Sequence, residues 1–325
     1  MKIYRDKDAD LTLLKDRSIV IIGYGNQGTA FAHNLRDSGF DVAIALRSPS
    51  KSASIAVDDG FPVVDNADAV AADLLLFMLP DHLHGEFFKE HLEGKLRKGQ
   101  VLVFAHGYSV HFGLIDAPSG VSCLLVAPHG PGSDLRDRYL DKTGLSCFVA
   151  AYPKNSGKPL HLAVAIAAAC GCTRAGAFKT SFENETIGDL FGEQALLCGG
   201  LSHLILSVFD TLVDNGIPPE NAYLETANQL DLLARLIREY GIAGMMDRVS
   251  LTAQFGTVTA EKVLGNKALR SKLQRLCDDV KSGSFSKRWA EEYKRGYPKL
   301  DEFKKSLRKS LFEITSRKMR KLLED

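Results

Sequence analysis

The sequence lacks the features that would place it in a membrane or on a nucleic acid. Its 41 basic and 40 acidic residues give a net charge of +1, so no strong field of one sign attracts nucleic acid or an anionic membrane. No run approaches the roughly 18 uninterrupted apolar residues of a membrane span. The opening residues, among them Lys2, Arg5 and Asp6, have no apolar stretch of the kind a signal peptide carries. These absences predict a soluble, cytoplasmic protein.

Cysteine is also scarce, and its spacing excludes the common zinc motifs. The six cysteines are Cys123, Cys147, Cys170, Cys172, Cys198 and Cys277, and none of them forms a CxxC pair or stands beside paired histidines. Their apolar surroundings predict small buried side chains in a reducing compartment. A redox function for the Cys170 and Cys172 pair stays open as the alternative.

The chain changes character near residue 180. Its 325 residues exceed what one hydrophobic core usually supports. Before that point, runs rich in Val, Ile and Leu alternate with helical stretches, and the predicted strands are 18–22, 42–46, 74–78, 101–105, 123–127 and 146–151. Apolar strands without polar alternation are typical of a parallel sheet covered on both faces. From Asn184 onward apolar residues recur at helical spacing instead. We therefore expect an α/β Rossmann domain with a doubly wound parallel sheet over residues 1–181, followed by an all-α domain over residues 182–325.

A glycine-rich turn follows the first predicted strand. It reads Gly23-Tyr24-Gly25-Asn26-Gln27-Gly28, a GxGxxG pattern between a strand and a helix. Glycines at these positions allow a tight turn, close approach of a pyrophosphate and close packing of helix on strand. The positive end of the helix dipole then faces the phosphates. The sequence predicts a dinucleotide site here.

The end of the second predicted strand indicates which nicotinamide cofactor binds. NAD sites place an Asp or Glu there to accept from the ribose 2′-OH. This chain instead has Arg47 and Lys51, together with the hydroxyls of Ser48, Ser50 and Ser52. A guanidinium binds a phosphate bidentately. NADPH is therefore the predicted cofactor.

Several separated motifs resemble the ketol-acid reductoisomerase family in its short, class I form. Besides the glycine turn they are Leu79-Pro80-Asp81, Phe104-Ala105-His106-Gly107, Ala127-Pro128-His129-Gly130-Pro131-Gly132 and Asp189-Leu190-Phe191-Gly192-Glu193-Gln194. The resemblance implies that magnesium-assisted alkyl migration in a 2-acetohydroxy acid precedes reduction by NADPH. It also implies a homodimer with intertwined, knotted helical domains whose active sites take residues from both subunits. It adds Leu79, Pro80, Asp81, His106 and Gly132 to the cofactor site and includes His106 among the catalytic residues.

The same resemblance assigns the acidic residues of the helical domain. It makes Asp189 and Glu193 direct metal ligands, if magnesium is retained, and their i,i+4 spacing places both carboxylates on one helix face. Hard Mg²⁺ takes oxygen ligands of this kind. The partner subunit would add Glu225, and Ser250 would contact the substrate carboxylate.

The chain departs from the family pattern around the substrate. Gln229 replaces a second glutamate, and His129 replaces a lysine. An amide keeps the acceptor oxygen but loses the charge, and an imidazole titrates near neutrality. Around Ser250, Asn has become Leu251 and Glu has become Gln254. Alkyl migration relies on divalent ions to stabilise developing charge, whereas hydride transfer mainly needs an acceptor carbon beside the nicotinamide.

Three hypotheses follow for a small-molecule substrate. The first is a diverged paralogue that reduces a cyclic imine, iminium or carbonyl group without magnesium-dependent migration. In it, Asp189, Glu193, Glu225 or His129 stabilises charge or delivers a proton. The second is an authentic reductoisomerase that converts 2-acetolactate in spite of Gln229 and His129. The third is a catalytically silent NADPH-binding protein.

The residues after the second strand generate a test of cofactor choice. We expect NADPH to bind at least about tenfold more tightly than NADH, and Arg47→Asp to shrink this preference. The substitution removes a charge-assisted hydrogen bond that contributes about 1.5–3 kcal/mol. Fluorescence titration of both cofactors measures the effect, and equal affinity of the parent protein for both would refute the assignment.

Overall fold

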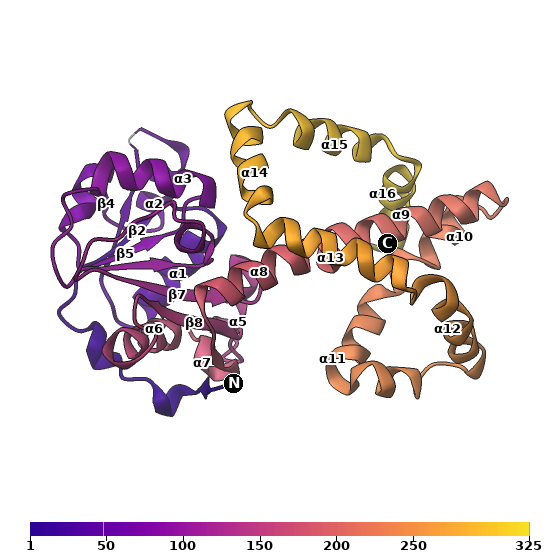
Figure 1. Ribbon diagram of the computed structural model, residues 1–325, viewed down its shortest axis with the longest axis horizontal. Coiled ribbons are helices and arrows are strands. Elements are labelled where there is room, and N and C mark those ends of the chain that lie inside the picture. Colours follow the sequence, from indigo (N-terminus) through magenta and orange to yellow (C-terminus); the bar gives the residue numbers. More distant parts are fainter. Residues whose placement is uncertain (48, 325) are drawn as a thin grey trace. The chain divides into compact units, whose positions relative to one another are not determined.

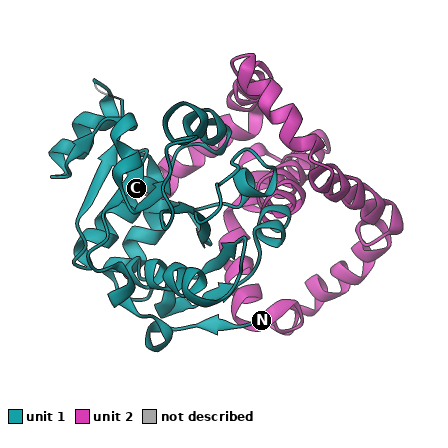
Figure 2. Cartoon of the chain, turned by 60° about the vertical axis from the view of Figure 1, so that its left-hand side comes forward, with its two compact units in different colours: residues 1–188 teal, residues 189–325 magenta. Residues whose placement is uncertain are grey.

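The chain divides into two compact units. A computed structural model of the protein describes residues 1–47 and 49–324. The units are Met1–Gly188 and Asp189–Asp325, coloured teal and magenta in Figure 2. Helix α8 (Phe182–Gly192) crosses from one to the other. The expected boundary after residue 181 lies at the first residue of that helix.

The first unit contains a nine-stranded sheet with the order β1-β9-β8-β7-β6-β5-β2-β3-β4 (Figure 1). The strands are β1 (Ile3–Tyr4), β2 (Ile19–Ile22), β3 (Val42–Ala45), β4 (Val63–Val64), β5 (Leu74–Phe77), β6 (Val101–Phe104), β7 (Ser122–Pro128), β8 (Cys147–Tyr152) and β9 (Ala177–Lys179). All six predicted strands are confirmed. The three that sequence reasoning missed, β1, β4 and β9, have only two or three residues each, which is too short for a periodic pattern.

The sheet is parallel from β7 across to β4, and two of its other pairs are antiparallel. β8 runs against β7, with Pro128 opposite Cys147. The chain therefore leaves β7, forms α5 (Gly132–Leu140) and returns to the same end of the sheet. β1 also pairs antiparallel with β9. The apolar runs predicted burial on both faces correctly, but burial does not fix strand direction.

Helices cover both faces of this sheet. They are α1 (Asn26–Asp37), α2 (Lys51–Asp58), α3 (Asp81–Phe87), α4 (Tyr108–His111), α6 (Gly157–Ala169) and α7 (Cys172–Ala175), with 3-10 segments η1 (Asp6–Asp8), η2 (Leu11–Leu14) and η3 (Asn66–Ala71) and the π-helical η4 (Phe88–Leu92). Side chains along β2 alternate between two cores. Ile19 and Ile21 pack with Phe31 of α1, whereas Val20 and Ile22 pack with Phe88 of η4. The predicted doubly wound Rossmann fold is confirmed.

Strand order places the loops that matter for function at one edge. The chain proceeds from β2 outward to β3 and β4, then crosses to β5 on the other side of β2. A crevice opens at such a reversal, beyond the carboxyl ends of the strands, where α/β folds bind ligands. The loops after β2, β5, β6 and β7 all meet at this edge because these strands are parallel.

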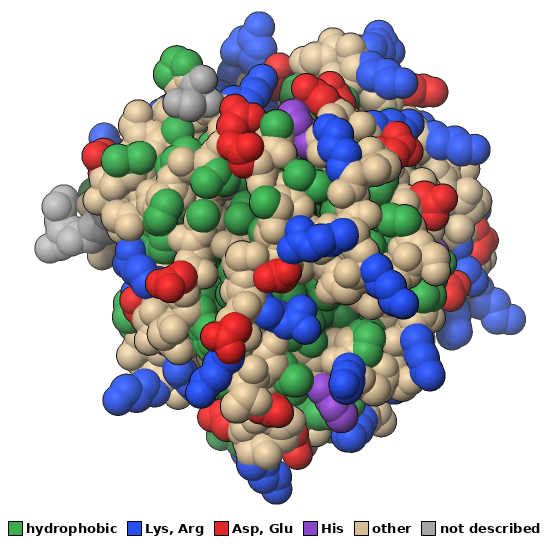
Figure 3. Space-filling model, turned by 90° about the vertical axis from the view of Figure 1, so that its left-hand side faces the viewer, with side chains coloured by type: hydrophobic (Ala, Val, Ile, Leu, Met, Phe, Trp, Pro, Cys, Tyr) green, Lys and Arg blue, Asp and Glu red, His purple; other side chains and the backbone are tan. Residues whose placement is uncertain are grey.

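Surface charge agrees with the balanced composition. On the face shown in Figure 3, basic and acidic side chains are interspersed. Net charge is +1, so no strong field of one sign attracts a polyanion.

The second unit is helical, as predicted, and its own core is small. It contains the end of α8, the π-helical η5 (Glu193–Leu197), α9 (Gly199–Asp214), α10 (Pro219–Leu224), η6 (Ala227–Gln229), α11 (Leu230–Met246), α12 (Leu251–Leu264), α13 (Lys267–Lys281), α14 (Ser284–Lys294), α15 (Pro298–Lys309) and α16 (Leu311–Glu324). Phe209, Tyr223 and Met319 are buried together. Many large apolar side chains are exposed instead, including Leu197, Leu251 and Phe255 at 65%, 80% and 73%.

One helical stretch is long and apolar enough to pass a test for membrane spans. The continuous run Phe182–Asp214 has 33 residues, an 18-residue window with mean hydropathy 1.7, and only 6% of that window buried. By length and composition it is able to cross a membrane, although polar and charged residues such as Glu193, His203 and Asp210 interrupt its apolar run. A single such helix is a weak indication of a membrane span.

Candidate cofactor and active site

The glycine-rich turn has the geometry that a dinucleotide requires. Gly23 has φ +99°, a left-handed conformation that side chains disfavour. A Cβ on Gly28 would overlap the Gly23 carbonyl oxygen, so α1 packs directly on the turn. A Cβ on Gly25 would meet nothing within 4 Å. Gly25 thus borders open space at the start of α1 and, because glycine has no side chain, it does not cap the helix amides. These amides fit a pyrophosphate.

The loop after β7 closes against this turn. The Gln27 side-chain amide donates to the Gly130 carbonyl at 3.0 Å, and a Cβ on Gly132 would overlap the Asn26 carbonyl oxygen. Two loops that are about a hundred residues apart in sequence therefore meet. The predicted association of Asn26, Gln27 and Gly132 in one site agrees with this packing.

Tyr24 contributes to the turn through its backbone. Its side chain is 6% exposed and lies in the core against Phe61. Its hydroxyl donates to Asp59 Oδ2 at 2.7 Å. The phenol therefore points away from the surface on which a cofactor would lie.

The predicted 2′-phosphate residues follow β3 directly. Arg47 is exposed, and Ser48 lies outside the described residues. Ser50 caps α2, because its hydroxyl oxygen accepts from the Ala53 N–H at 3.1 Å. Ser52 lies in the first turn of α2 and is half-buried. Two exposed cations therefore lie in this segment, Arg47 after β3 and Lys51 at the first residue of α2.

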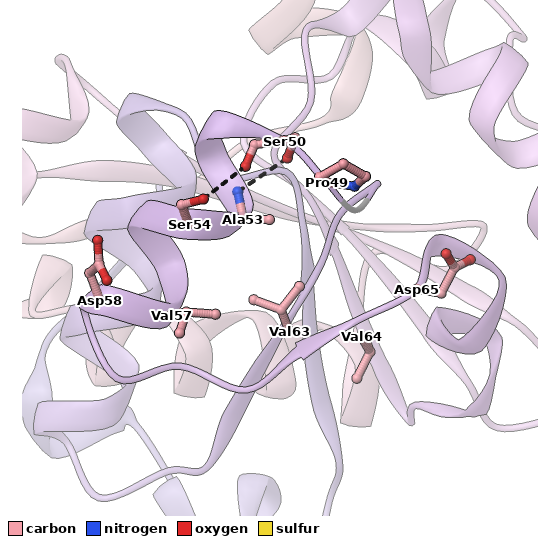
Figure 4. A pocket seen from close by; sticks show the side chains of 9 residues that line it. All are labelled: Pro49, Ser50, Ala53, Ser54, Val57, Asp58, Val63, Val64 and Asp65. Atoms are coloured by element: carbon pink, nitrogen blue, oxygen red, sulfur yellow. Dashed lines mark hydrogen bonds between the residues drawn. The ribbon is translucent and has the colours of Figure 1, made fainter.

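A surface pocket of about 450 Å³ lies beside this segment, between α2 and β4. Figure 4 shows Ser50 and Ser54 near one end and Val63 and Val64 opposite α2. Its other lining residues are Pro49, Ala53, Val57, Asp58 and Asp65. Ser50 belongs both to this pocket and to the predicted 2′-phosphate residues, whereas Arg47, Lys51 and Ser52 are not among the lining residues.

A histidine and two carboxylates meet where β5 and β6 end. His106 Nδ1 lies 3.9 Å from Asp81 Oδ2, and His106 Nε2 lies 4.0 Å from Glu185 Oε1. The Tyr108 N–H donates to His106 Nδ1 at 3.3 Å, so in the neutral ring the proton is on Nε2, toward Glu185. The site therefore holds a proton donor between two acidic groups.

Glu185 is a functional candidate that sequence reasoning missed. It is 4% exposed, and its Oε2 accepts from the Gly107 N–H at 2.7 Å. Buried carboxylates with defined partners mark functional sites. Its spacing could have revealed it, because Glu185, Asp189 and Glu193 recur every fourth residue and share one helix face.

His84 is a second buried residue that the motifs did not reveal. Its Nε2 lies 2.8 Å from the Leu79 carbonyl and its Nδ1 2.8 Å from Ser109 Oγ. A carbonyl only accepts, so Nε2 carries the proton and Ser109 donates to Nδ1. Burial lowers the pKa of His84, which keeps the ring neutral. His84 thereby ties the Leu79-Pro80-Asp81 loop to α4, which directly follows His106 and Gly107.

In the helical unit, the carboxylates assigned by resemblance lie in separate places. Asp189 and Glu193 are exposed on α8 and at the start of η5. Among residues 1–47 and 49–324, no three His, Cys, Asp or Glu side chains converge as a metal site. The carboxylate oxygens of Asp189 and Glu193 are ligands of the kind that Mg²⁺ prefers. These two residues alone do not complete the coordination of the ion within one chain.

Glu225 and Gln229 contact each other. The Gln229 side-chain NH₂ donates to Glu225 Oε2 at 3.2 Å and to the Leu224 carbonyl at 3.1 Å. Both side chains are exposed. Gln229 here behaves as a donor to the carboxylate, which a glutamate at this position would not do.

His129 and Ser250 are both exposed. His129 Nδ1 lies 2.9 Å from Ser146 Oγ, and its ring packs against the edge of Phe148 at 4.4 Å. Ser250 caps α12, since its hydroxyl oxygen accepts from the Ala253 N–H at 3.2 Å. Each side chain is therefore held in place by a short local contact.

The cysteines are free thiols in the described part of the chain. Cys123, Cys147, Cys170 and Cys172 are buried, as expected, whereas Cys198 is exposed. Burial raises the pKa of Cys170 well above its usual range. A thiol held protonated is a poor nucleophile, so the redox alternative gains no support.

Comparison with known proteins identifies the chain. Residues 13–176 match the family model described as "Acetohydroxy acid isomeroreductase, NADPH-binding domain", and residues 182–325 match "Ketol-acid reductoisomerase, C-terminal domain". The chain belongs to the ketol-acid reductoisomerase family. Ketol-acid reductoisomerase (NAD(P)(+)) of Metallosphaera sedula is 44% identical over 99% of this chain and 97% of its own length. Ketol-acid reductoisomerase (NADP(+)) of Saccharolobus solfataricus is 41% identical with the same coverage.

A solved structure extends this likeness to the fold. The NADH-preferring ketol-acid reductoisomerase from an uncultured archaeon superimposes with a TM-score of 0.92 at 34% identity, covering 99% of both chains. The protein is thus an oxidoreductase of the ketol-acid reductoisomerase family, with an NAD(P)-binding domain. The resemblance seen in the sequence motifs is confirmed.

Gly107 offers a test of the contact between α8 and the His106 loop. Its φ of −78° suits any residue, but a Cβ there would overlap Thr186 Oγ1 and lie 2.7 Å from Glu185 Oε2. We expect Gly107→Ala to lower the free energy of unfolding by about 1–3 kcal/mol through overpacking. Thermal unfolding measures this loss. Gly188→Ala on the same helix, where a Cβ meets nothing within 4 Å, is the control and should not destabilise. Equal stability of both variants would contradict the contact.

Proposed function

We propose that the protein converts a 2-acetohydroxy acid such as 2-acetolactate to a 2,3-dihydroxy acid with NADPH. The observation that carries this proposal is the joint presence of an open glycine turn and the His106–Glu185 pair at one edge of the sheet. Relatives named ketol-acid reductoisomerase, 41–44% identical over 99% of the chain, support it.

The residues of the first unit supply the reductive step. NADPH would deliver hydride to the carbonyl carbon of the rearranged substrate. The turn at residues 23–28 orients the cofactor, and Gly132 and Gln27 fix the neighbouring loop. His106 holds its Nε2 proton beside Glu185, and it lies just after β6, at the same edge of the sheet as the turn. Burial of Glu185 limits exchange of this proton with water.

NADPH in preference to NADH is part of the proposal and is supported by Arg47. No carboxylate occurs among residues 46–52, directly after β3, whereas NAD sites place one there. Relatives carry both NADP(+) and NAD(P)(+) in their names, so the residues after β3 and not family membership decide the preference.

Asp189 and Glu193 are proposed to hold magnesium, whose charge would stabilise the substrate oxygens during migration. We infer that a second copy of the chain adds Glu225. The support is that one chain forms no three-ligand cluster within its described residues and that its helical unit exposes apolar side chains a monomer would bury. An intertwined homodimer accounts for the helix Phe182–Asp214 without a membrane. The cytoplasmic location remains a prediction.

A second candidate function is reduction of a C=N or C=O group without migration. It is favoured by Gln229, which donates to Glu225 and leaves the pair with one carboxylate, and by His129 in place of a lysine. The relatives support the first proposal and give no support to imine reduction, so this candidate depends on these two residues alone. Membership of an oxidoreductase family gives no support to the third hypothesis, a catalytically silent NADPH-binding protein.

A substrate and metal test separates the two candidates. We expect NADPH oxidation with 2-acetolactate to require magnesium and to stop in EDTA, because migration needs divalent charge. Absorbance at the nicotinamide band gives the rate. Turnover of a 2-keto acid or a cyclic imine that is unchanged in EDTA, with no turnover of 2-acetolactate, would select the second candidate. Gln229→Glu with His129→Lys should then raise magnesium affinity.

Mixed dimers test the shared site. Asp189→Ala and Glu225→Ala chains should each be inactive as homodimers, and co-refolded mixtures should regain about a quarter of parent activity, since half of the dimers are mixed and each has one intact site. A mixture of Asp189→Ala with Glu193→Ala chains is the control, because each of the two sites in a mixed dimer then lacks one of the two residues. Absence of rescue in the first mixture would exclude a site shared between subunits.

A further inference from the structure

A connected, partly exposed group of side chains joins the glycine-rich turn to α1 and to the end of α2. It consists of Tyr24, His33, Arg36, Asp59 and Phe61, all in the first unit. The group is separate from the catalytic residues at the ends of β5 and β6. Its contacts determine where the turn at residues 23–28 can lie.

Asp59 is the centre of the group. Its Oδ2 accepts from the Tyr24 hydroxyl at 2.7 Å and lies 3.5 Å from His33 Nε2. Burial raises the pKa of Tyr24, and the hydrogen bond from Tyr24 lowers the pKa of Asp59. Both shifts keep the phenol as a neutral donor and the carboxylate as an ionised acceptor at neutral pH.

Arg36 fixes the other members. One guanidinium nitrogen donates to the Asp59 carbonyl at 2.7 Å and another to His33 Nδ1 at 2.8 Å. Arginine only donates, so His33 Nδ1 accepts and the neutral ring carries its proton on Nε2, toward Asp59 and the Tyr24 hydroxyl at 3.3 Å. The guanidinium also lies over the Phe61 ring, 4.4 Å from its centroid.

The turn has little other side-chain anchorage on this side. Of its six residues, three are glycines and Asn26 is exposed, while Gln27 reaches across to Gly130. The Tyr24 phenol is therefore the side chain that ties the first half of the turn to the core. A displaced turn would misplace the amides at the start of α1 that fit a pyrophosphate.

We propose that Asp59 is a positioning residue for cofactor binding, which holds the glycine-rich turn in its binding conformation by accepting the hydrogen bond of Tyr24. The inference rests on the proposed cofactor site and is independent of the substrate. Because a pyrophosphate is common to both nicotinamide cofactors, the turn contributes equally to NADPH and NADH. Arg47, by contrast, distinguishes the two.

The test measures NADPH and NADH affinity by fluorescence titration without substrate. Tyr24→Phe removes only the hydroxyl and keeps the ring against Phe61, and Asp59→Ala removes the acceptor. Each should weaken binding of both cofactors by about three- to tenfold, the effect of one hydrogen bond. With 2-acetolactate and magnesium, KM for NADPH should rise by the same factor, while kcat at saturating NADPH stays within about twofold of the parent value.

Two variants serve as controls. Asp59→Asn keeps an acceptor oxygen and should retain most of the affinity. Asp58→Ala removes the exposed neighbouring carboxylate of α2 and should bind like the parent. Unchanged affinity in Tyr24→Phe and Asp59→Ala overturns the proposal, as does an equal loss in Asp58→Ala or a loss confined to NADPH. A parent protein that binds neither cofactor would refute the cofactor site itself, which the parent titration reveals before any variant is compared.

Discussion

The close contact between the start of α1 and the turn before it is the constraint on which the cofactor crevice depends. Gly28 lies so near the Gly23 carbonyl that no side chain fits between them. This contact brings the amides of α1 to the edge of the sheet, where the loops after β5, β6 and β7 also end. Gln27 and Gly132 then join the last of these loops to the turn.

Buried polar groups hold the loops around this crevice in fixed positions. Glu185 accepts from the Gly107 amide, and His84 connects the Leu79 carbonyl to Ser109. Glu185 and His84 each form hydrogen bonds with buried groups of these loops. A buried donor or acceptor left without such a bond costs about 1–3 kcal/mol. The same contacts therefore stabilise the fold and align His106.

The helical unit is organised differently. Its buried core is confined to α9, α10 and α16, and residues such as Leu251 and Phe255 are largely exposed. The residues that the resemblance assigns to the metal and substrate fall into two groups on the helices, Asp189 with Glu193 and Glu225 with Gln229. The dimer proposed above would bring these two groups together and cover the exposed apolar side chains.

The sequence by itself determined the Rossmann class, the six main strands, the helical second half and the cofactor turn, because apolar periodicity and glycine spacing are local properties. The family motifs also pointed to Asp189, Glu193 and His106. Only the tertiary structure revealed the antiparallel β8, since a buried strand looks alike in either direction. It also decided that Tyr24 faces Asp59, that Ser50 caps α2 and that Glu185 lies beside His106. The contacts of Tyr24 with Asp59 and of Glu185 with His106 join segments that are distant in sequence. For Ser50, the structure decides between a ligand and a nearby backbone amide as the partner of the hydroxyl. Residue type alone specifies none of these.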